Sequence, residues 1–183
     1  MSPARAGDAA VERPASGPWA AVPLYMIAVV VVVLDQITKL IVDQGMRLGQ
    51  IIPVVPGLFN LSYVLNPGAA FGIMASKSPA FRSPFFVGVS VLAIGLIVYY
   101  YHRHLRDETR LPGAALGLIL GGAVGNLIDR LRVGMVIDFL DFYFASYHWP
   151  AFNVADAAIS CGVGLMLLRM LQEWRRERAL SPR

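Results

Sequence analysis

The sequence predicts an all-α membrane fold with four transmembrane helices and a small lobe of short strands outside the bilayer. Of the 183 residues, 56% are hydrophobic and only 15% are charged, a composition typical of membrane proteins. Four long apolar runs are candidate spans, since crossing the hydrocarbon core takes about 20 helical residues. A more polar segment after the first run holds only short apolar stretches, which favour strands.

The chain begins with a polar tail and a full-length apolar run. Residues 1–18 mix small and charged residues with proline and show no periodicity, so we expect a disordered tail. The run from about Trp19 to Val42 contains Asp35. A cleavable signal peptide would have a shorter apolar core and a small-residue cleavage site, so this run is predicted to remain as the first transmembrane helix.

Basic residues set the expected orientation. The other apolar runs cover about residues 85–101, 111–128 and 151–171. The loop after the second run is rich in histidine and arginine, and residues 173–183 form an arginine-rich tail. Because cytoplasmic loops carry the excess of Lys and Arg, this loop and both termini are predicted to lie in the cytoplasm. We therefore expect a membrane domain over residues 19–172 between two cytoplasmic tails.

Segment 43–79 is predicted to form the lobe outside the bilayer. Its apolar stretches, residues 51–55 and 58–64, have the length of strands. Near its end, Asn66 and Gly68 belong to a run of small residues that permits a tight turn. Since the first span leaves the cytoplasm, the lobe is expected on the extracytoplasmic side.

Polar side chains of three spans are expected at one depth, near the outer face. The first and third spans leave the cytoplasm and carry these residues toward their far ends, whereas the fourth enters from outside and carries them in its first turns. Carboxylates near a membrane centre cost about 2.5 to 3.5 kcal/mol each on insertion scales, so several at one level suggest a site. The residues are Asp35, Lys39, Asn126, Asp129, Arg130, Asn153 and Asp156.

Two features of the spans are interpreted as helix packing. Asp35 and Lys39 are four residues apart and share a helix face, so we favour a structural ion pair over a catalytic role. Gly121, Gly122 and Gly125 form a small-residue face that allows another helix to approach closely.

Asp138 and Asp156 are candidates for acid and base chemistry. Asp138 lies in the apolar run Val136–Phe139, which we expect to be extended and to return to the membrane surface beside Asp156. Two nearby carboxylates share one proton, so one activates a water while the other protonates or polarises a carbonyl. On the residues alone, Asp129 is an equally good partner for Asp156. The adjacent Arg130 favours an ion-paired structural role for Asp129.

Other chemistries lack the residues that they need. The three histidines are too scattered for a metal site, and no cofactor is expected. The formal charge of +4 comes from arginines beside apolar runs and not from a basic stripe with aromatics, so no nucleic-acid partner is expected. Cys161 has no second cysteine to pair with and is expected to pack within its helix.

Five stretches, in order along the chain, resemble the signature motifs of the lipoprotein signal peptidase family, also called signal peptidase II. The resemblance covers about residues 20–172, with Pro67 where the family more often has Thr and Ile137 where Val is common. The five stretches are Asp35–Lys39, Asn66–Phe71, Gly121–Arg130, Val136–Phe139 and Phe152–Asp156.

The resemblance implies a bacterial cytoplasmic-membrane aspartic endopeptidase with four transmembrane helices and a small extracytoplasmic β-cradle. Such enzymes cleave the signal peptide from prolipoproteins before the cysteine that carries a diacylglyceryl group. The implied partners are these modified signal peptides and membrane lipids, and we expect a monomer. The implied catalytic residues are Asp138 and Asp156, the supporting or substrate-binding residues are Asn66, Gly68, Asn126, Asp129, Arg130 and Asn153, and the supporting pair is Asp35 with Lys39.

Two other functions use carboxylates in a membrane. A proton-coupled transporter would need carboxylates that are accessible from both sides, and the sequence shows no internal repeat of the kind found in transporters. A noncatalytic scaffold would tolerate amides in place of the acidic residues. Unchanged prolipoprotein processing in Asp156→Asn would favour the scaffold over the enzyme.

Overall fold

Four helices dominate the fold, and each is long and apolar enough to cross a membrane. The computed structural model describes residues 22–68, 78–105 and 110–180, so the tail predicted over residues 1–18 lies outside the described part. The helices are α1 (Val22–Gly45), α2 (Pro79–Tyr100), α3 (Arg110–Val133) and α4 (Val154–Leu180), and a π-helical turn, η3 (Tyr101–Leu105), continues α2.

Three helices, α2, α3 and α4, are longer than the apolar runs that predict them. The sequence predicts an end of the third span near Ile128, whereas α3 continues to Val133. Helix α4 continues through the arginine-rich segment to Leu180, and Arg169 and Glu173 form an ion pair of 2.7 Å along it. Hydropathy places the boundary at the first charged residues, although charged side chains that find partners are compatible with a continuing helix.

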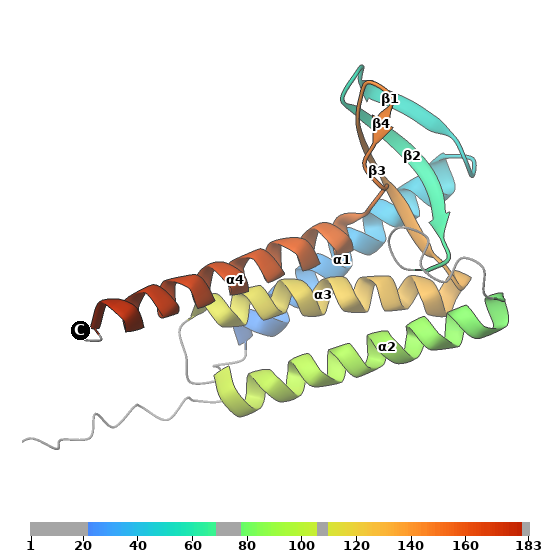
Figure 1. The fold of residues 1–183 in the computed structure, drawn as a ribbon. Coiled ribbons are helices and arrows are strands. Elements are labelled where there is room, and N and C mark those ends of the chain that lie inside the picture. The colour runs from blue at the N-terminus through green and yellow to red at the C-terminus, as the bar shows by residue number, and fades with distance from the viewer. Residues whose placement is uncertain (1–21, 69–77, 106–109, 181–183) are drawn as a thin grey trace, which may run out of the picture.

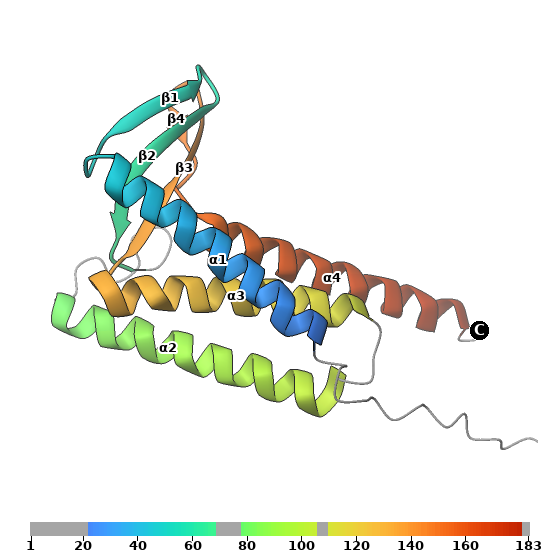
Figure 2. The ribbon, with the colours of Figure 1, turned by 180° about the vertical axis from the view of Figure 1, so that it is seen from behind.

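Helix α3 lies at the centre of the bundle. It packs against α1 and α4, and α2 lies along its other side (Figures 1 and 2). At Gly121, a Cβ atom would lie 2.7 Å from the Ala28 carbonyl oxygen of α1. At Gly122, a Cβ atom would overlap the Ala155 carbonyl of α4. The predicted small-residue face therefore does allow close helix contact.

A four-stranded antiparallel sheet forms the lobe, with the strand order β1-β2-β3-β4. Strand β3 pairs with β2, so that Asn66 lies opposite Val136 and Val64 lies opposite Asp138. The lobe predicted over residues 43–79 therefore also includes a segment that follows α3. The strands are β1 (Ile51–Val55), β2 (Phe59–Asn66), β3 (Val136–Phe144) and β4 (Tyr147–His148).

A glycine in the left-handed backbone conformation connects α3 to the sheet. Gly134 has a φ of 74°, in the region that favours glycine, and turns the chain into β3. The sequence predicts an extended run only over Val136–Phe139. The strand is longer because its second half pairs with β2 and β4, which local sequence does not reveal.

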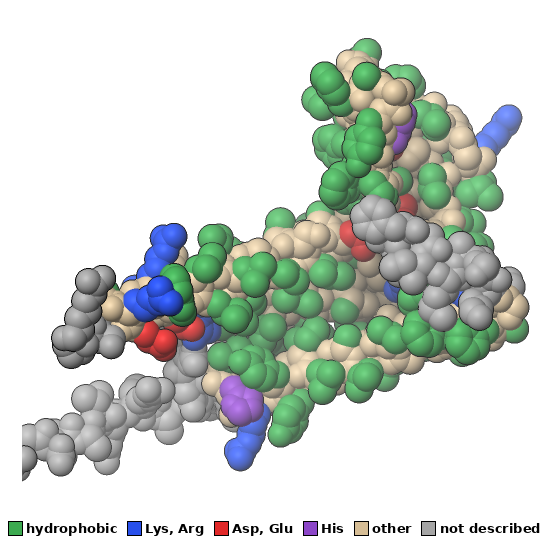
Figure 3. Space-filling model, viewed as in Figure 1, with side chains coloured by type: hydrophobic (Ala, Val, Ile, Leu, Met, Phe, Trp, Pro, Cys, Tyr) green, Lys and Arg blue, Asp and Glu red, His purple; other side chains and the backbone are tan. Residues whose placement is uncertain are grey.

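The sheet projects sideways from the end of the bundle where α1 ends and α4 begins (Figures 1 and 2). A buried apolar cluster of Val42 from α1 with Tyr63, Ile137 and Phe139 from the sheet joins the two parts. The Tyr63 hydroxyl also donates a hydrogen bond to Asp43 at the end of α1. Figure 3 shows acidic side chains at the surface where the lobe meets the bundle, and both basic and acidic side chains at the opposite end.

Candidate active site

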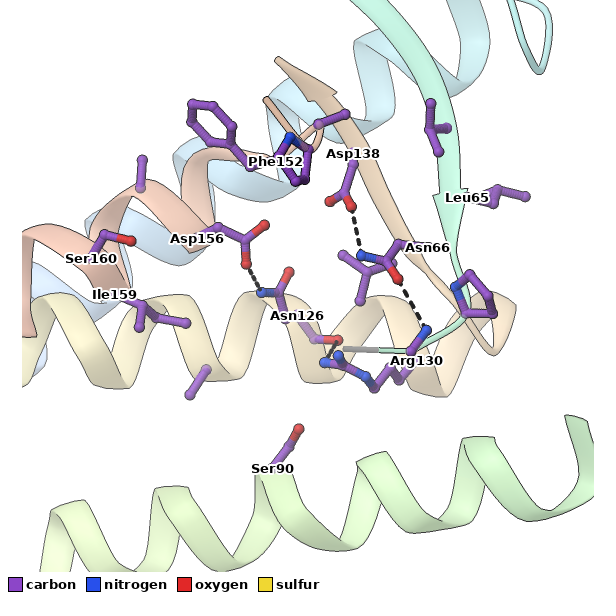
Figure 4. A pocket seen from close by; sticks show the side chains of 18 of the residues that line it. Leu65, Asn66, Ser90, Asn126, Arg130, Asp138, Phe152, Asp156, Ile159 and Ser160 are labelled. Atoms are coloured by element: carbon purple, nitrogen blue, oxygen red, sulfur yellow. Dashed lines mark hydrogen bonds between the residues drawn. The ribbon is translucent and has the colours of Figure 1, made fainter. Parts of the chain in front are cut away.

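A cavity of about 900 Å³ lies where the lobe meets the bundle. Strands β2 and β3 and helices α2, α3 and α4 contribute to its wall, and most of the lining side chains are apolar (Figure 4). Its polar lining includes Asn66, Asn126, Arg130, Asp138 and Asp156. Polar residues that the sequence places on separate segments thus meet at one cavity.

Asp138 is presented to the cavity by β3 and is 2% exposed. Its Oδ1 accepts a hydrogen bond of 2.7 Å from Asn153 Nδ2, and its Oδ2 accepts one of 3.0 Å from Asn66 Nδ2. Burial, followed by the nearby charge of Asp156, raises the pKa of Asp138 to about 7, although these hydrogen bonds act in the opposite direction. Asp138 is therefore a carboxyl group that keeps its proton below neutral pH.

Asp156 lies in the first turn of α4 and is partly exposed to the cavity. Its Oδ1 accepts a hydrogen bond of 2.8 Å from Asn126 Nδ2, and its Oδ2 accepts one of 3.3 Å from the backbone N–H of Asn153. The backbone N–H of Asp156 in turn donates to Asn153 Oδ1 at 2.9 Å. This reciprocal cap begins α4.

Asn153 connects the two carboxyl groups. Its side chain is fully buried, and its Nδ2 donates to Asp138 and, at 3.2 Å, to the carbonyl oxygen of Ile137. Its Oδ1 and backbone N–H hold Asp156, as described above. The three-residue spacing predicts the contact between Asn153 and Asp156, whereas the contact with Asp138 depends on the position of β3.

Asn66 is oriented by the turn that follows β2. Its Oδ1 accepts a hydrogen bond of 3.0 Å from the backbone N–H of Gly68, which leaves its Nδ2 to donate to Asp138 (Figure 4). Asparagine commonly makes this local turn by bonding to a backbone group two residues on. The rest of the predicted motif, residues 69–71, lies outside the described part of the chain.

A buried ionic cluster lies behind Asn126. Lys39 Nζ is 2.9 Å from Asp35 Oδ2 and 2.8 Å from Asp129 Oδ2, and all three side chains have 0% exposure. Lys39 Nζ also donates a hydrogen bond of 2.9 Å to Asn126 Oδ1. Asp35 Oδ1 accepts one of 2.9 Å from the backbone N–H of Ala155 in α4. The ion pair that the spacing predicts is present, and it joins α1 to both α3 and α4.

Asp129 pairs with Lys39 and not, as the sequence analysis favours, with Arg130. Neighbouring residues on a helix point in different directions, so adjacency in the sequence does not bring their side chains together. Asp129 Oδ2 also accepts a hydrogen bond of 3.1 Å from the backbone N–H of Ile137, at the start of β3. Asp129 is not among the described residues that line the cavity. The alternative that the sequence leaves open therefore has no support from the geometry.

Gln36 belongs to the same cluster, although the sequence analysis does not single it out. Its Nε2 lies 3.1 Å from each of three acceptors, namely Asp35 Oδ2, Asp129 Oδ1 and the Gly125 carbonyl oxygen. At Gly125, a Cβ atom would lie 2.5 Å from Asp35 Oδ2, so only glycine fits beside the cluster. An amide next to a carboxylate within an apolar span is the signal that could have indicated Gln36.

Arg130 contributes positive charge to the cavity wall. Its Nη1 donates a hydrogen bond of 3.2 Å to the Asn126 carbonyl oxygen, and its guanidinium lies 5.5 Å from the centre of the Phe86 ring. Helix α2, which carries Phe86, is thereby linked to α3 at the level of the carboxyl groups. Arg130 thus faces the cavity without being the partner of Asp129.

The arrangement suits hydrolysis of an amide bond. One carboxyl group is buried and holds its proton, and the other accepts N–H donors at a helix N-terminus. Pairs of titratable groups in such unlike environments divide the roles of general acid and general base. Attack of a water on a carbonyl carbon needs both roles at one place.

Comparison with known proteins also indicates a peptidase. The family model described as signal peptidase (SPase) II matches residues 27–172. A lipoprotein signal peptidase of Geobacter sulfurreducens is 54% identical over 159 residues, which cover 85% of this chain and 98% of that protein. One of Geobacter metallireducens is 50% identical over 152 residues, which cover 83% of this chain and 92% of that protein.

A solved structure described as a bacterial membrane enzyme shares the fold. It superposes with a TM-score of 0.76 at 31% sequence identity, over 87% of this chain and 94% of that one. Family and fold together exclude the transporter and scaffold interpretations. The chain belongs to the signal peptidase II family, and it is an aspartic peptidase of bacterial membranes that removes signal peptides from lipoprotein precursors.

Proposed function

We propose that Asp138 and Asp156 are the catalytic pair of this peptidase. The observation that carries the proposal is the double contact of Asn153, whose amide donates to Asp138 at 2.7 Å and whose carbonyl accepts from the Asp156 backbone at 2.9 Å. Both aspartates line the same cavity, whereas Asp129 is held in the buried cluster. One fixed side chain thus sets the relative position of the two carboxyl groups.

The two environments divide the roles. Asp156, with N–H donors on both carboxylate oxygens, is the general base and takes a proton from a water as the water oxygen attacks the scissile carbonyl carbon. Asp138 is the general acid and gives its proton to the substrate, first at the carbonyl oxygen. When the C–N bond breaks, the amine leaves with the proton that Asp156 holds, and Asp138 recovers its own from the new carboxyl group. Burial and the raised pKa of Asp138, about 7, support this assignment.

The other polar residues support the pair or contact the substrate. Asn66 and Asn153 hold Asp138, and Asn126 holds Asp156. Arg130 lines the cavity and is positioned to face a substrate carbonyl or headgroup oxygen. Gly68, in the turn beside Asn66, is buried in the cavity wall, and its lack of a side chain leaves room for a bound peptide chain.

The substrate is a diacylglyceryl-modified prolipoprotein, cleaved before its lipidated cysteine. The apolar part of the cavity wall supports this choice, because Val89 and Ala93 of α2 and Ile159 of α4 extend the cavity along the spans. A signal peptide helix and acyl chains bury apolar surface against such a wall. We propose that the signal peptide lies between the spans while its acyl chains remain in lipid, and that the enzyme acts as a monomer.

The active site lies near the outer face of the membrane, and both termini lie in the cytoplasm. Arg175, Arg176 and Arg178 stand at the end of the bundle opposite the lobe, where the positive-inside rule places cytoplasmic residues. Residues 1–18 and 173–183 would then be cytoplasmic tails of the membrane domain 19–172. Labelling of Leu58→Cys, in a Cys161→Ser background, by an impermeant thiol reagent on spheroplasts tests this orientation. Modification only after lysis would reverse it.

The lobe contacts lipid. Every residue of β1 is exposed although four of its five side chains are large and apolar, and Ile51 reaches 57% exposure. The sheet projects sideways from the helices that are long enough to span a membrane (Figure 1), and this direction supports contact of these side chains with the bilayer surface. Contact with lipid would remove from water an apolar surface that the protein itself leaves uncovered.

Cleavage of a diacylglyceryl-modified prolipoprotein by purified variants tests the catalytic pair. We expect Asp138→Asn and Asp156→Asn to fold and to lose activity by at least about a thousandfold, because each removes a group that takes part in proton transfer. Asp129→Asn should retain measurable activity while losing thermal stability. Normal cleavage by Asp138→Asn, together with loss of cleavage by Asp129→Asn, would show that the pair is wrong although the enzyme is a peptidase.

A further inference from the structure

The side-chain amide of Asn126 is engaged at both ends. Its Oδ1 accepts hydrogen bonds from Lys39 Nζ at 2.9 Å and from Asn153 Nδ2 at 3.3 Å. Its Nδ2 donates a hydrogen bond of 2.8 Å to Asp156 Oδ1. Asn126 therefore stands between a buried ammonium group and the proposed general base.

Only one direction of this amide satisfies all of its neighbours. An ammonium group can only donate hydrogen bonds, and an ionised carboxylate can only accept them. If the amide turned over, its NH₂ would face Lys39 Nζ and its carbonyl oxygen would face Asp156. Both contacts would then be repulsive, so Lys39 acts together with Asn153 Nδ2 and with Asp156 itself to keep an N–H directed at Asp156.

Lys39 is itself held in place. Asp35 and Asp129 bind its Nζ at 2.9 and 2.8 Å, and its side chain has no exposed surface. Lys39 is not among the described residues that line the cavity, so it has no direct path to the substrate. Its charge also acts on Asp138 through space, whereas its hydrogen-bonded connection to Asp156 runs through Asn126.

We propose that Lys39 is a positioning residue of the peptidase, which fixes the direction of the Asn126 amide so that its N–H is presented to Asp156. Its importance to the reaction rests on the proposed role of Asp156 as the base, whereas its effect on Asn126 does not. A purely structural ion pair would explain why Lys39 is buried beside Asp35 and Asp129. It would not explain why the third hydrogen-bond acceptor of the ammonium group is the amide that binds Asp156.

The first test compares kinetic constants of Lys39→Met with those of Asp35→Asn as a matched control. Both variants break the buried ion pair, but Asp35→Asn keeps the ammonium group beside Asn126. We expect kcat of Lys39→Met to fall by at least about tenfold, as for loss of a charge-assisted hydrogen bond, while KM stays within about twofold. The fall in kcat for Asp35→Asn should be much smaller. Equal falls in both variants would leave Lys39 as a structural residue only.

The double variant Asp35→Asn/Lys39→Met provides the same comparison if the single variant does not fold. It removes one carboxylate together with the ammonium group, so the net charge of the buried cluster stays as in the wild type. This variant should show the kcat of Lys39→Met and be more stable than Lys39→Met, because it leaves one buried carboxylate, Asp129, and not two without a cation. Wild-type kcat in the folded double variant would overturn the proposal.

A double-mutant cycle with Asn126→Ala tests the path. If Lys39 acts through Asn126, then Lys39→Met should change kcat by less than about twofold in the Asn126→Ala background. A further fall as large as that seen with Asn126 present would mean that Lys39 acts independently of the amide, and would overturn the proposal.

An infrared measurement tests the contact without requiring catalysis. Subtracting the spectrum of a matching Asp156→Asn protein isolates the carboxylate stretching bands of Asp156. We expect these bands to shift in Lys39→Met, since the hydrogen bond from Asn126 is weakened, and not to shift further when Lys39→Met is added to Asn126→Ala. Unshifted bands in Lys39→Met would refute the inference, whereas shifted bands with an active Asp156→Asn enzyme would instead refute the catalytic role of Asp156.

Discussion

Asn153 Nδ2 lies 2.7 Å from Asp138 Oδ1, although the first residue precedes α4 and the second belongs to β3. Because Asn153 also caps α4 through its Oδ1, the same side chain begins a helix and binds a carboxyl group on a strand. One buried amide therefore links the lobe directly to the bundle at the active site.

Asn153→Ser and Asn153→Ala separate these two roles. Serine keeps an oxygen that caps α4 but has no amide to donate to Asp138, so kcat should fall by roughly tenfold to a hundredfold in both variants, as for loss of a hydrogen bond to a charged or polar group. Alanine also loses the cap and should be less stable than serine by about 1 kcal/mol. Prolipoprotein cleavage and thermal denaturation in detergent measure the two effects. Wild-type kcat in Asn153→Ser would contradict the role in the active site.

The rate should decrease at alkaline pH. The pKa of Asp138 is raised to about 7, so this carboxyl group is protonated below that pH and loses its proton above it. As general acid, it is active in the protonated form, and kcat should fall as pH rises from about 7 to 9. Intrinsic fluorescence over the same range controls for unfolding. A rate that is constant between pH 6 and 9 would exclude Asp138 as the acid.

Asp138 should also make the free energy of unfolding decrease as pH rises, whereas aspartates with a lowered pKa make it increase. Its pKa is raised from 3.8 to about 7, so the folded state binds a proton that the unfolded chain releases. The resulting stabilisation is complete below pH 3.8 and is lost as pH rises through about 7. Asp138→Asn lacks this dependence, so its Tm relative to wild type should increase from pH 5 to pH 8. A constant difference would indicate an ordinary pKa.

Gly122→Ala should displace the first turn of α4. The added methyl group would overlap the Ala155 carbonyl and lie 2.7 Å from Ile159 Cγ1, and the carbonyl belongs to the residue before Asp156. We expect a loss of about 1 to 3 kcal/mol in stability from overpacking, together with at least about a tenfold lower kcat. Gly164→Ala is the matched control, because its Cβ would meet no atom within 4 Å. Equal behaviour of the two variants would argue against close packing at Gly122.

Tyr63→Phe should affect stability more than activity. The Tyr63 hydroxyl donates to Asp43, and burial and this carboxylate raise the pKa of the hydroxyl to about 12. Removing the donor should cost about 1 kcal/mol of unfolding free energy. Neither residue is among the described lining of the cavity, so kcat should change by less than about twofold. A large loss of kcat without loss of stability would show that this contact controls the active site.

The membrane fold could be predicted from composition and span length, and so could the depth shared by the polar residues. Asp129 shows where this reasoning fails. Its nearest charged neighbour in the sequence is Arg130, but its partner is Lys39 on another helix, and the span continues beyond Asp129 because that partner neutralises the charge. A partner on a distant segment leaves no local pattern in the sequence.

The sheet shows a second limit. The pairing of β1 with β2 follows from two short apolar stretches separated by a turn, and the sequence indicates it. The pairing of β2 with β3 joins segments that two helices separate, and its register places Asp138 opposite Val64. Residue identities around Asp138 predict that it is important, but its contact with Asn66 depends on this register, and its contact with Asn153 depends on the pairing of Leu140 with Phe152.

The strand order has a consequence for how the protein is made. Strands β1 and β2 leave the ribosome early, but β3 is synthesised only after α2 and α3, and Asp156 follows later still. Before β3 is synthesised, the sheet lacks its third strand, and before the start of α4 is synthesised, Asn153 is absent. On the proposed assignment of Asp138 and Asp156, the nascent chain lacks its catalytic pair while its earlier hydrophobic segments are entering the membrane, and the active site is complete only once the start of its last helix has been synthesised.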